Sequence, residues 1–228
     1  MTWVKICATT SLEDARASVV AGANALGFIF APSTRRITVE TAAAITAQLP
    51  AEVEKIGVFV NQSPQQVAET AEAAGLTGVQ LHGDEPPAQL AGFRQAVGSR
   101  RIIKTLQARQ LLMEANREQA LGQYFKERRH FDAILLDSGT PSQRGGTGIP
   151  FDWEEAFPVA GAIKAVMPLI IAGGLNPANV SQAIRLFRPF GVDVVSGVER
   201  EVGRKDAGKL REFVAAARAV DEELAISS

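Results

Sequence analysis

Residues 168–187, PLIIAGGLNPANVSQAIRLF, contain one complete unit of the predicted fold. The run PLIIA (168–172) is short and apolar, as expected for a strand that is covered on both faces. The segment NPANVSQAIRLF (176–187) follows a Gly-Gly pair and has the residue spacing of a helix. A strand followed by a helix is the repeating unit of a parallel α/β sheet.

The same order of strand and helix recurs along the whole chain. In the segment 63–75, for example, Ser63 is placed as an N-cap, Pro64 as the first helical residue and Gly75 as a terminator. The pattern predicts about eight strands, at residues 3–7, 25–30, 54–60, 77–82, 101–106, 131–137, 168–172 and 191–195.

Eight such units in 228 residues predict an α/β fold with a single-domain (β/α)8 TIM barrel over residues 1–228. An open doubly wound sheet fits less well, because it usually has fewer strands, and no GxGxxG fingerprint follows the first strand here. Residues 108–130 are longer than their counterparts in the other units and polar at their end. We interpret them as an extended fifth helix.

The composition excludes several classes of protein. The chain has 24 basic and 25 acidic residues with no long block of one sign, so it has no electrostatic footprint for nucleic acid. No apolar stretch is long enough to span a membrane. The single cysteine, Cys7, cannot form an internal disulfide, and the two histidines, His82 and His130, fall on different units. We therefore expect a cytoplasmic protein with no metal, no cofactor, and no nucleic-acid or membrane partner.

Candidate functional residues lie at the carboxyl ends of the predicted strands, where barrels of this kind collect their chemistry. These residues are Cys7, Arg35, Arg36, Asn61, His82, Asp137, Gly173, Gly174, Ser196 and Gly197. Residues two apart share a strand face, so Lys5 and Cys7 point the same way, as do Leu135 and Asp137. If those faces look inward, Cys7 and Asp137 face each other across the mouth of the barrel.

Each of these side chains also has a purely structural interpretation. Free cysteines are commonly small buried apolar residues, which could describe Cys7. Asp137 could serve as a cap or an ion-pair partner, because a buried carboxylate needs partners. His82 could be a structural histidine, and Arg36 a solvated residue of a polar turn.

The glycine-rich segments are more specific signals. A Gly-Gly pair at 173–174 and a Ser-Gly pair at 196–197 follow the seventh and eighth predicted strands, where barrels present backbone N–H groups to a phosphate. Two adjacent arginines, Arg35 and Arg36, suit a planar carboxylate. The loop DSGTPSQRGGTG (137–148) has the composition of a mobile cover over an active site.

In their order and spacing, these motifs resemble the phosphoribosylanthranilate isomerase family of tryptophan biosynthesis. The resemblance covers nearly the whole chain. It includes VKIC (4–7), LGFIFAPSTRRIT (26–38), GVFVNQ (57–62), VQLHGDE (79–85), ILLDS (134–138), IIAGGLNPANV (170–180) and GVDVVSGVE (191–199).

The resemblance implies an Amadori rearrangement of N-(5'-phosphoribosyl)anthranilate to 1-(2-carboxyphenylamino)-1-deoxyribulose 5-phosphate, without a metal or organic cofactor. By resemblance, Cys7 is the general base and Asp137 the general acid. Arg36 matches the arginine that receives the anthranilate carboxylate, and His82 matches an active-site histidine. The phosphate of the small-molecule substrate would bind the backbone of Gly173, Gly174, Ser196 and Gly197.

The sequence departs from the common family pattern at several positions. Ala8 follows the cysteine where a glycine is usual, and Val195 replaces a common serine near the phosphate. Arg35 precedes Arg36 where a proline is usual, so either arginine could meet the carboxylate. None of these changes affects the acid and base. Lys5 shares a face with Cys7, and its positive charge would favour the thiolate that a base requires.

Other functions remain open at this point. A related phosphate-binding barrel acts on the aminoaldose of histidine biosynthesis, but its family would place an aspartate where Cys7 stands. A non-catalytic barrel that binds a phosphorylated metabolite would need neither Cys7 nor Asp137. The sequence is compatible with a monomer or a homodimer.

Overall fold

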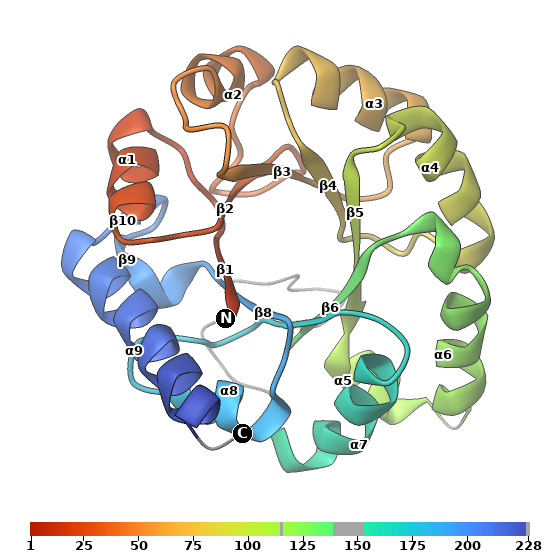
Figure 1. Cartoon of the computed structure of the whole chain (residues 1–228). Helices are drawn as coiled ribbons and strands as arrows, with labels where there is room; N and C mark the ends of the chain where they lie inside the picture. The colour runs from red at the N-terminus through yellow and green to blue at the C-terminus, as the bar shows by residue number, and fades with distance from the viewer. Residues whose placement is uncertain (115, 139–152, 227–228) are drawn as a thin grey trace.

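Eight parallel strands form a closed barrel, in chain order around the ring (Figure 1). The computed structural model describes residues 1–114, 116–138 and 153–226. The strands are β1 (Trp3–Ile6), β2 (Ala25–Ile29), β3 (Glu54–Phe59), β4 (Gly78–Leu81), β5 (Arg101–Gln107), β6 (Ala133–Asp137), β7 (Leu169–Ile171) and β8 (Gly191–Val194). Pairing of β1 with β8 closes the ring, which confirms the predicted barrel. Each observed strand overlaps one predicted from the sequence.

Figure 1 shows the helices as an outer ring around these strands. They are α1 (Leu12–Val20), α2 (Val39–Thr46), α3 (Pro64–Ala73), α4 (Leu90–Val97), α5 (Ala108–Met113), α6 (Arg117–Lys126), α7 (Trp153–Lys164), α8 (Val180–Phe187) and α9 (Ala207–Ile226). The predicted start of α3 is confirmed: Ser63 and Gln66 form a reciprocal capping box and Pro64 is the first helical residue.

The prediction of one extended fifth helix over residues 108–130 is wrong. The segment contains α5, α6 and a short 3-10 helix, η2 (Arg128–His130). The chain leaves the helical conformation at Glu114, whose ψ is 123°. The polar end of the segment belongs to α6, in which Leu121 is the buried residue and the other side chains are partly or fully exposed.

The core has an inner and an outer layer. The inner cluster fills the barrel and consists of Trp3, Ala25, Ile56, Ile103, Ala133, Leu135, Ile170 and Ala172. The outer layer packs the other strand faces against the helices. Ala133 and Leu135 are inner residues, and Asp137 continues their face of β6. The alternation along β6 therefore points Asp137 inward at the carboxyl end, as predicted.

The helix α9 covers the seam where β8 meets β1, between α1 and α8 (Figure 1). It is tied to the start of the chain: the Thr2 N–H and hydroxyl donate to Asp221, and Arg218 donates to the Thr2 carbonyl. Among the helices that the structure describes, none has the length and apolar character needed to cross a membrane.

A two-stranded antiparallel hairpin of β9 (Glu199–Glu201) and β10 (Arg204–Lys205) lies outside the barrel. It follows a short 3-10 helix, η3 (Ser196–Val198), at the carboxyl end of β8. Register places Glu199 opposite Lys205. The hairpin thus begins directly after one of the two predicted phosphate-binding loops.

Candidate active site

A pocket of about 280 Å³ opens at the carboxyl ends of the strands. Of the candidate residues named from the sequence, it brings together Cys7, Arg35, His82, Asp137, Gly173, Gly174 and Ser196. The lining also includes residues that the sequence analysis did not select, among them Gln80 and Asp193. From Gly139 onward, the predicted cover loop 137–148 lies outside the described residues.

Cys7 lies beside a buried ion pair at the seam of the barrel. Lys5 Nζ is 2.9 Å from Asp193 Oδ1, and both side chains are buried. The two residues are register partners in β1 and β8. Gly27 in β2 leaves room for them, since a Cβ there would lie 2.5 Å from Cys7 Sγ and 3.0 Å from Lys5 Nζ. A glycine at this position therefore lets the Lys5 ammonium and the Cys7 thiol lie side by side.

Burial and the neighbouring charges shift the pKa values of Cys7 and Lys5 in opposite directions. Burial raises the pKa of the Cys7 thiol, the Lys5 ammonium lowers it, and the net shift is upward. Burial alone would lower the pKa of Lys5, but Asp193 and Cys7 raise it, and the net shift is also upward. At neutral pH, a protonated thiol therefore predominates beside a permanent ammonium ion.

Asp137 contacts His82, which comes from the end of β4. His82 Nε2 is 3.3 Å from Asp137 Oδ2. On the other side of the ring, Gln80 Nε2 is 3.1 Å from His82 Nδ1 and also donates to Thr105 Oγ1. An amide N–H donates, so Nδ1 accepts and a neutral His82 carries its proton on Nε2, facing Asp137. This arrangement orients a hydrogen-bond donor toward the candidate acid.

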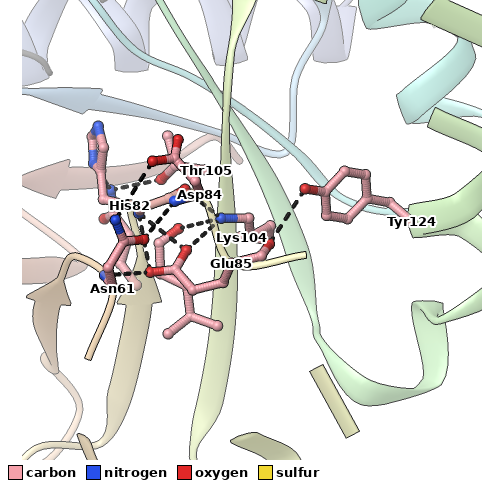
Figure 2. A network of polar contacts seen from close by, with 10 residues as sticks. Asn61, His82, Asp84, Glu85, Lys104, Thr105 and Tyr124 are labelled. Atoms are coloured by element: carbon pink, nitrogen blue, oxygen red, sulfur yellow. Dashed lines mark hydrogen bonds and ion pairs between the residues drawn. The ribbon is translucent and has the colours of Figure 1, made fainter. Parts of the chain in front are cut away.

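The turn that follows His82 is fixed by a buried polar network (Figure 2). Lys104 Nζ in β5 is 2.6 Å from Glu85 Oε2 and donates to the Gly83 carbonyl at 2.8 Å. Glu85 Oε1 accepts the Asn61 N–H at 2.9 Å, and Tyr124 of α6 reaches the Glu85 carbonyl. Burial, followed by the charge of Glu85, raises the pKa of Tyr124 to about 12. The network holds the loops after β3 and β4 in one arrangement and so fixes the backbone next to His82.

The two glycine-rich loops also line the pocket, through Gly173, Gly174 and Ser196. Gly173 and Gly174 both have positive φ, +83° and +69°, which glycine adopts without strain. Ser196 opens the short helix η3, whose N–H groups are suited to an anion. Gly197 does not line the pocket: a Cβ there would overlap the Leu175 carbonyl, so this glycine allows η3 to pack on the loop after β7.

Of the two adjacent arginines, Arg35 lines the pocket and Arg36 does not. The Arg35 side chain is only 14% exposed and donates to Glu199 from Nε and Nη2, at 2.9 and 2.7 Å. Arg36 forms an isolated bridge with Ile29, and its side chain is exposed. In this structure Glu199 holds Arg35 at the pocket, and the Arg36 side chain is exposed, so the assignment of the carboxylate to Arg36 stays a prediction.

The chain is similar to proteins of known function. The sequence matches the family model described as N-(5'phosphoribosyl)anthranilate (PRA) isomerase over residues 4–216. The chain belongs to this family. It is 45% identical over 221 residues to the N-(5'-phosphoribosyl)anthranilate isomerase of Geobacter sulfurreducens, which covers 96% of this chain and 99% of that protein. Membership in the PRA isomerase family makes the chain an isomerase.

Solved structures of PRA isomerases have the same fold. The enzyme from Thermotoga maritima is 39% identical with a TM-score of 0.81, and the match covers 96% of this chain and 100% of that one. A PRA isomerase structure with reduced 1-(o-carboxyphenylamino)-1-deoxyribulose 5-phosphate is 37% identical with a TM-score of 0.78, and the coverage is the same. The resemblance on which the sequence analysis relied is therefore confirmed.

The residues missed in the sequence analysis carry weaker signals. Gln80 precedes His82 by two residues and so shares its strand face, and Asp193 is an acidic residue within the apolar strand GVDVV. Within the described parts of the chain, no group of three or more His, Cys, Asp or Glu side chains could hold a metal ion. The expectation that the PRA isomerase reaction here needs no cofactor stays a prediction.

Proposed function

We propose that this chain converts N-(5'-phosphoribosyl)anthranilate to 1-(2-carboxyphenylamino)-1-deoxyribulose 5-phosphate in tryptophan biosynthesis, with Asp137 as general acid and Cys7 as general base. One observation carries the assignment of roles. Cys7 and Asp137 enter the same pocket from the ends of β1 and β6, and this pocket also contains Arg35 and the glycine-rich loops.

The acid step opens the sugar ring. Asp137 donates a proton to the ring oxygen of the ribose, the bond between that oxygen and C1' breaks, and the anilino nitrogen forms an imine cation with C1'. Asp137 is 4% exposed, and its Oδ2 lies 3.3 Å from His82 Nε2, so His82 helps to fix the carboxyl group relative to the pocket. A positioned acid of this kind contributes about 10²- to 10⁴-fold to a rate.

The base step forms the enolamine. The Cys7 thiolate removes the proton from C2', and the electrons of that C–H bond move toward the imine cation. Tautomerisation of the enolamine then gives the ketone. Lys5 is the group that favours the thiolate, because its ammonium lies beside the sulfur. Burial keeps the thiolate fraction small at neutral pH, so the base becomes more available as the pH rises.

The two ends of the substrate would bind at opposite sides of this pair. The 5'-phosphate is placed at the backbone of Gly173, Gly174 and Ser196, where glycine lets an anion approach N–H groups closely. The anthranilate carboxylate is assigned to the adjacent arginines after β2, to Arg36 by resemblance with Arg35 as the alternative, because a guanidinium can bind it through two parallel hydrogen bonds.

The test is turnover of phosphoribosylanthranilate, generated in place, by the purified protein with EDTA present. Loss of anthranilate fluorescence reports the conversion. We expect Asp137→Asn and Cys7→Ala each to reduce kcat by about 10²- to 10⁴-fold, the contribution of a positioned acid or base. Both variants should still bind the reduced product analogue in calorimetry. Glu118→Gln, an exposed carboxylate on α6, is the matched control and should turn over normally.

Three results would contradict this proposal. Full activity in either variant would refute the role of that residue. Loss of activity in EDTA, restored by a metal ion, would refute the metal-free reaction. A folded protein that binds the analogue without turnover would be a non-catalytic barrel, and turnover of only the histidine-pathway aminoaldose would identify the related activity.

The oligomeric state belongs to the same experiment. A structure of the Thermotoga maritima enzyme describes monomers generated from a dimeric protein. We expect this chain to be a monomer or a homodimer, and light scattering under the assay conditions distinguishes the two.

A further inference from the structure

The β9–β10 hairpin lies against the loop that follows Cys7. Thr10 Oγ1 in this loop donates to the Gly203 carbonyl, in the turn of the hairpin, at 2.6 Å. Arg204 Nη2 lies 2.7 Å from Glu13 Oε2 of α1, and Figure 1 shows the hairpin beside this helix. The hairpin is therefore fixed next to the strand end that carries the candidate base.

Lys205 of β10 places a buried ammonium group at the end of β8. Its side chain is 1% exposed, and its Nζ donates to the Val195 carbonyl at 3.1 Å. The Cys7 N–H donates to the carbonyl of the preceding residue, Val194, at 2.9 Å. The Lys205 ammonium and the backbone of Cys7 thus bind consecutive residues of the chain, and Cys7 and Val195 line the same pocket.

Lys5 favours the Cys7 thiolate, but its charge is matched by a partner of its own. Lys5 Nζ lies 2.9 Å from Asp193 Oδ1, and both side chains are buried. Burial raises the pKa of the Cys7 thiol, and the Asp193 carboxylate adds to this increase while Lys5 opposes it. The ion pair as a whole is neutral, so it supplies no excess of positive charge beside the sulfur.

The hairpin side of Cys7 has a different balance of charge. Glu199 is shared by two cations, because its carboxylate lies 2.7 Å from Arg35 Nη2 and 3.4 Å from Lys205 Nζ. The shorter contact is with Arg35, and Lys205 is the less completely neutralised of the two cations. Two cations and one anion leave one positive charge in excess, and a buried charge of this kind is weakly screened.

The pKa values of Cys7 and Lys205 show that the two groups interact. After burial, Lys5 and Asp193, Lys205 is a further group that acts on the pKa of the Cys7 thiol, and it lowers that pKa. Burial lowers the pKa of Lys205, Glu199 and then the Cys7 thiolate raise it, and the net shift is downward. The thiolate and the ammonium therefore each favour the charged form of the other.

We propose that Lys205 is a positioning residue for the base: its buried ammonium stabilises the Cys7 thiolate, and the β9–β10 hairpin thereby takes part in proton abstraction. The inference rests on the proposed function, in which Cys7 removes the C2' proton, and adds a group that determines how much thiolate is present. Lys205 is not part of the pocket lining, so it acts through Cys7 and not by contact with the substrate.

The test measures the thiol itself and needs no substrate. The ultraviolet absorbance of the thiolate is followed against pH, with Cys7→Ala as the blank, because the chain has one cysteine. We expect Lys205→Met to raise the midpoint by about 0.5 to 1 pH unit, which lowers the thiolate fraction at neutral pH by about 3- to 10-fold. The rate of Cys7 alkylation by iodoacetamide should fall by the same factor.

Two further variants separate the charge of Lys205 from its role in packing. Lys205→Arg keeps a positive charge throughout the titration and should keep the midpoint close to that of the wild type. Adding Glu199→Gln to Lys205→Met removes the anion as well, which restores the excess positive charge and should move the midpoint back toward the wild-type value. A merely structural role for the pair would not produce this reversal.

The variants are chosen to limit misfolding. In Lys205→Met, Glu199 keeps Arg35 as its partner, so no buried anion is left unpaired. Lys205→Gln removes the charge but keeps a donor for the Val195 carbonyl, and it should raise the midpoint in the same direction. Arg200→Gln removes a positive charge from a half-exposed position on the same hairpin and is the matched control, with an unchanged midpoint and normal turnover.

Turnover connects the thiol to the reaction. In Lys205→Met, the alkaline limb of kcat for phosphoribosylanthranilate should move to higher pH together with the thiol midpoint. An unchanged midpoint in folded Lys205→Met and Lys205→Gln would overturn the inference, as would a midpoint that moves while the limb of kcat does not. Full turnover by Cys7→Ala would contradict the proposed function instead, and the two failures are distinguishable because the thiol titration does not depend on turnover.

Discussion

At the scale of single residues, the contact that matters most for reactivity is between Lys5 and Cys7, which lie next to Gly27. The ammonium stabilises the thiolate, and burial opposes it. The balance leaves the thiol pKa above its ordinary value, so below that pKa the thiolate fraction grows about tenfold for each unit of pH. A reaction that uses this thiolate should accelerate as the pH rises from neutral.

We expect Lys5→Met to move this alkaline limb to higher pH. Removing the cation raises the thiol pKa further, and the Asp193 carboxylate left behind adds to the shift because it also disfavours the thiolate. At neutral pH, both kcat/KM and the rate of Cys7 alkylation by iodoacetamide should fall, and both should recover partly in alkali. Lys126→Met, an exposed lysine on α6, is the control. An unchanged pH profile for alkylation would show that Lys5 does not act on the thiol.

At the scale of elements, the pair of Lys104 in β5 and Glu85 in the loop after β4 fixes the turn next to His82 (Figure 2). Both side chains are almost fully buried, so loss of one partner leaves an uncompensated charge in the interior. We expect Lys104→Met to reduce the free energy of unfolding by about 3–5 kcal/mol, the usual effect of breaking a buried pair. Urea denaturation measures this.

The control for that measurement is Glu223→Gln, which breaks an ion pair with Arg185 whose two side chains are about half exposed. This change should leave the urea midpoint nearly unchanged, because exposed pairs are well solvated. Equal destabilisation by the two variants would contradict the structural role assigned to the Lys104 pair.

Some features of the strands, helices and pocket could be predicted from the sequence, and others could not. Strands and caps depend on neighbouring residues, and so the start of α3 at Pro64 was predictable. The strand period also placed Cys7 and Asp137 correctly in one pocket. The position of Arg35 at the pocket involves Glu199, which is 164 positions away in the chain. A contact over that distance cannot be predicted from a local sequence pattern. The break between α5 and α6 contains no Gly or Pro, the residues that usually indicate the end of a helix.

At the scale of the whole molecule, Asp221 of α9 accepts hydrogen bonds from Thr2 and so connects the last helix to the start of β1. Burial raises the pKa of Asp221, but hydrogen bonds from Thr2 and Arg218 lower it, and the net shift is downward. A carboxyl whose folded pKa is depressed stabilises the fold above its unfolded pKa. That stabilisation is lost as the pH falls through the folded value.

Asp221→Asn should therefore lower the Tm near neutral pH, and the difference from wild type should shrink on acidification below about pH 4, where an unfolded aspartate is protonated. Thermal unfolding followed by circular dichroism measures both values. Glu222→Gln, the exposed neighbour, is the control and should lower the Tm at neither pH. A Tm difference that stays constant between about pH 7 and pH 3 would exclude the charge of Asp221 as its cause.

The buried ion pair between Lys5 and Asp193 joins residues 188 positions apart in the chain. During synthesis, Lys5 and Cys7 leave the ribosome long before Asp193. Until β8 pairs with β1, Cys7 lacks the complete burial that raises its thiol pKa in the folded barrel. The nascent chain thus passes through a period in which its only cysteine is open to oxidants and electrophiles. Pairing of β8 with β1 ends that exposure and brings Asp193 to Lys5 beside the proposed base in the same event.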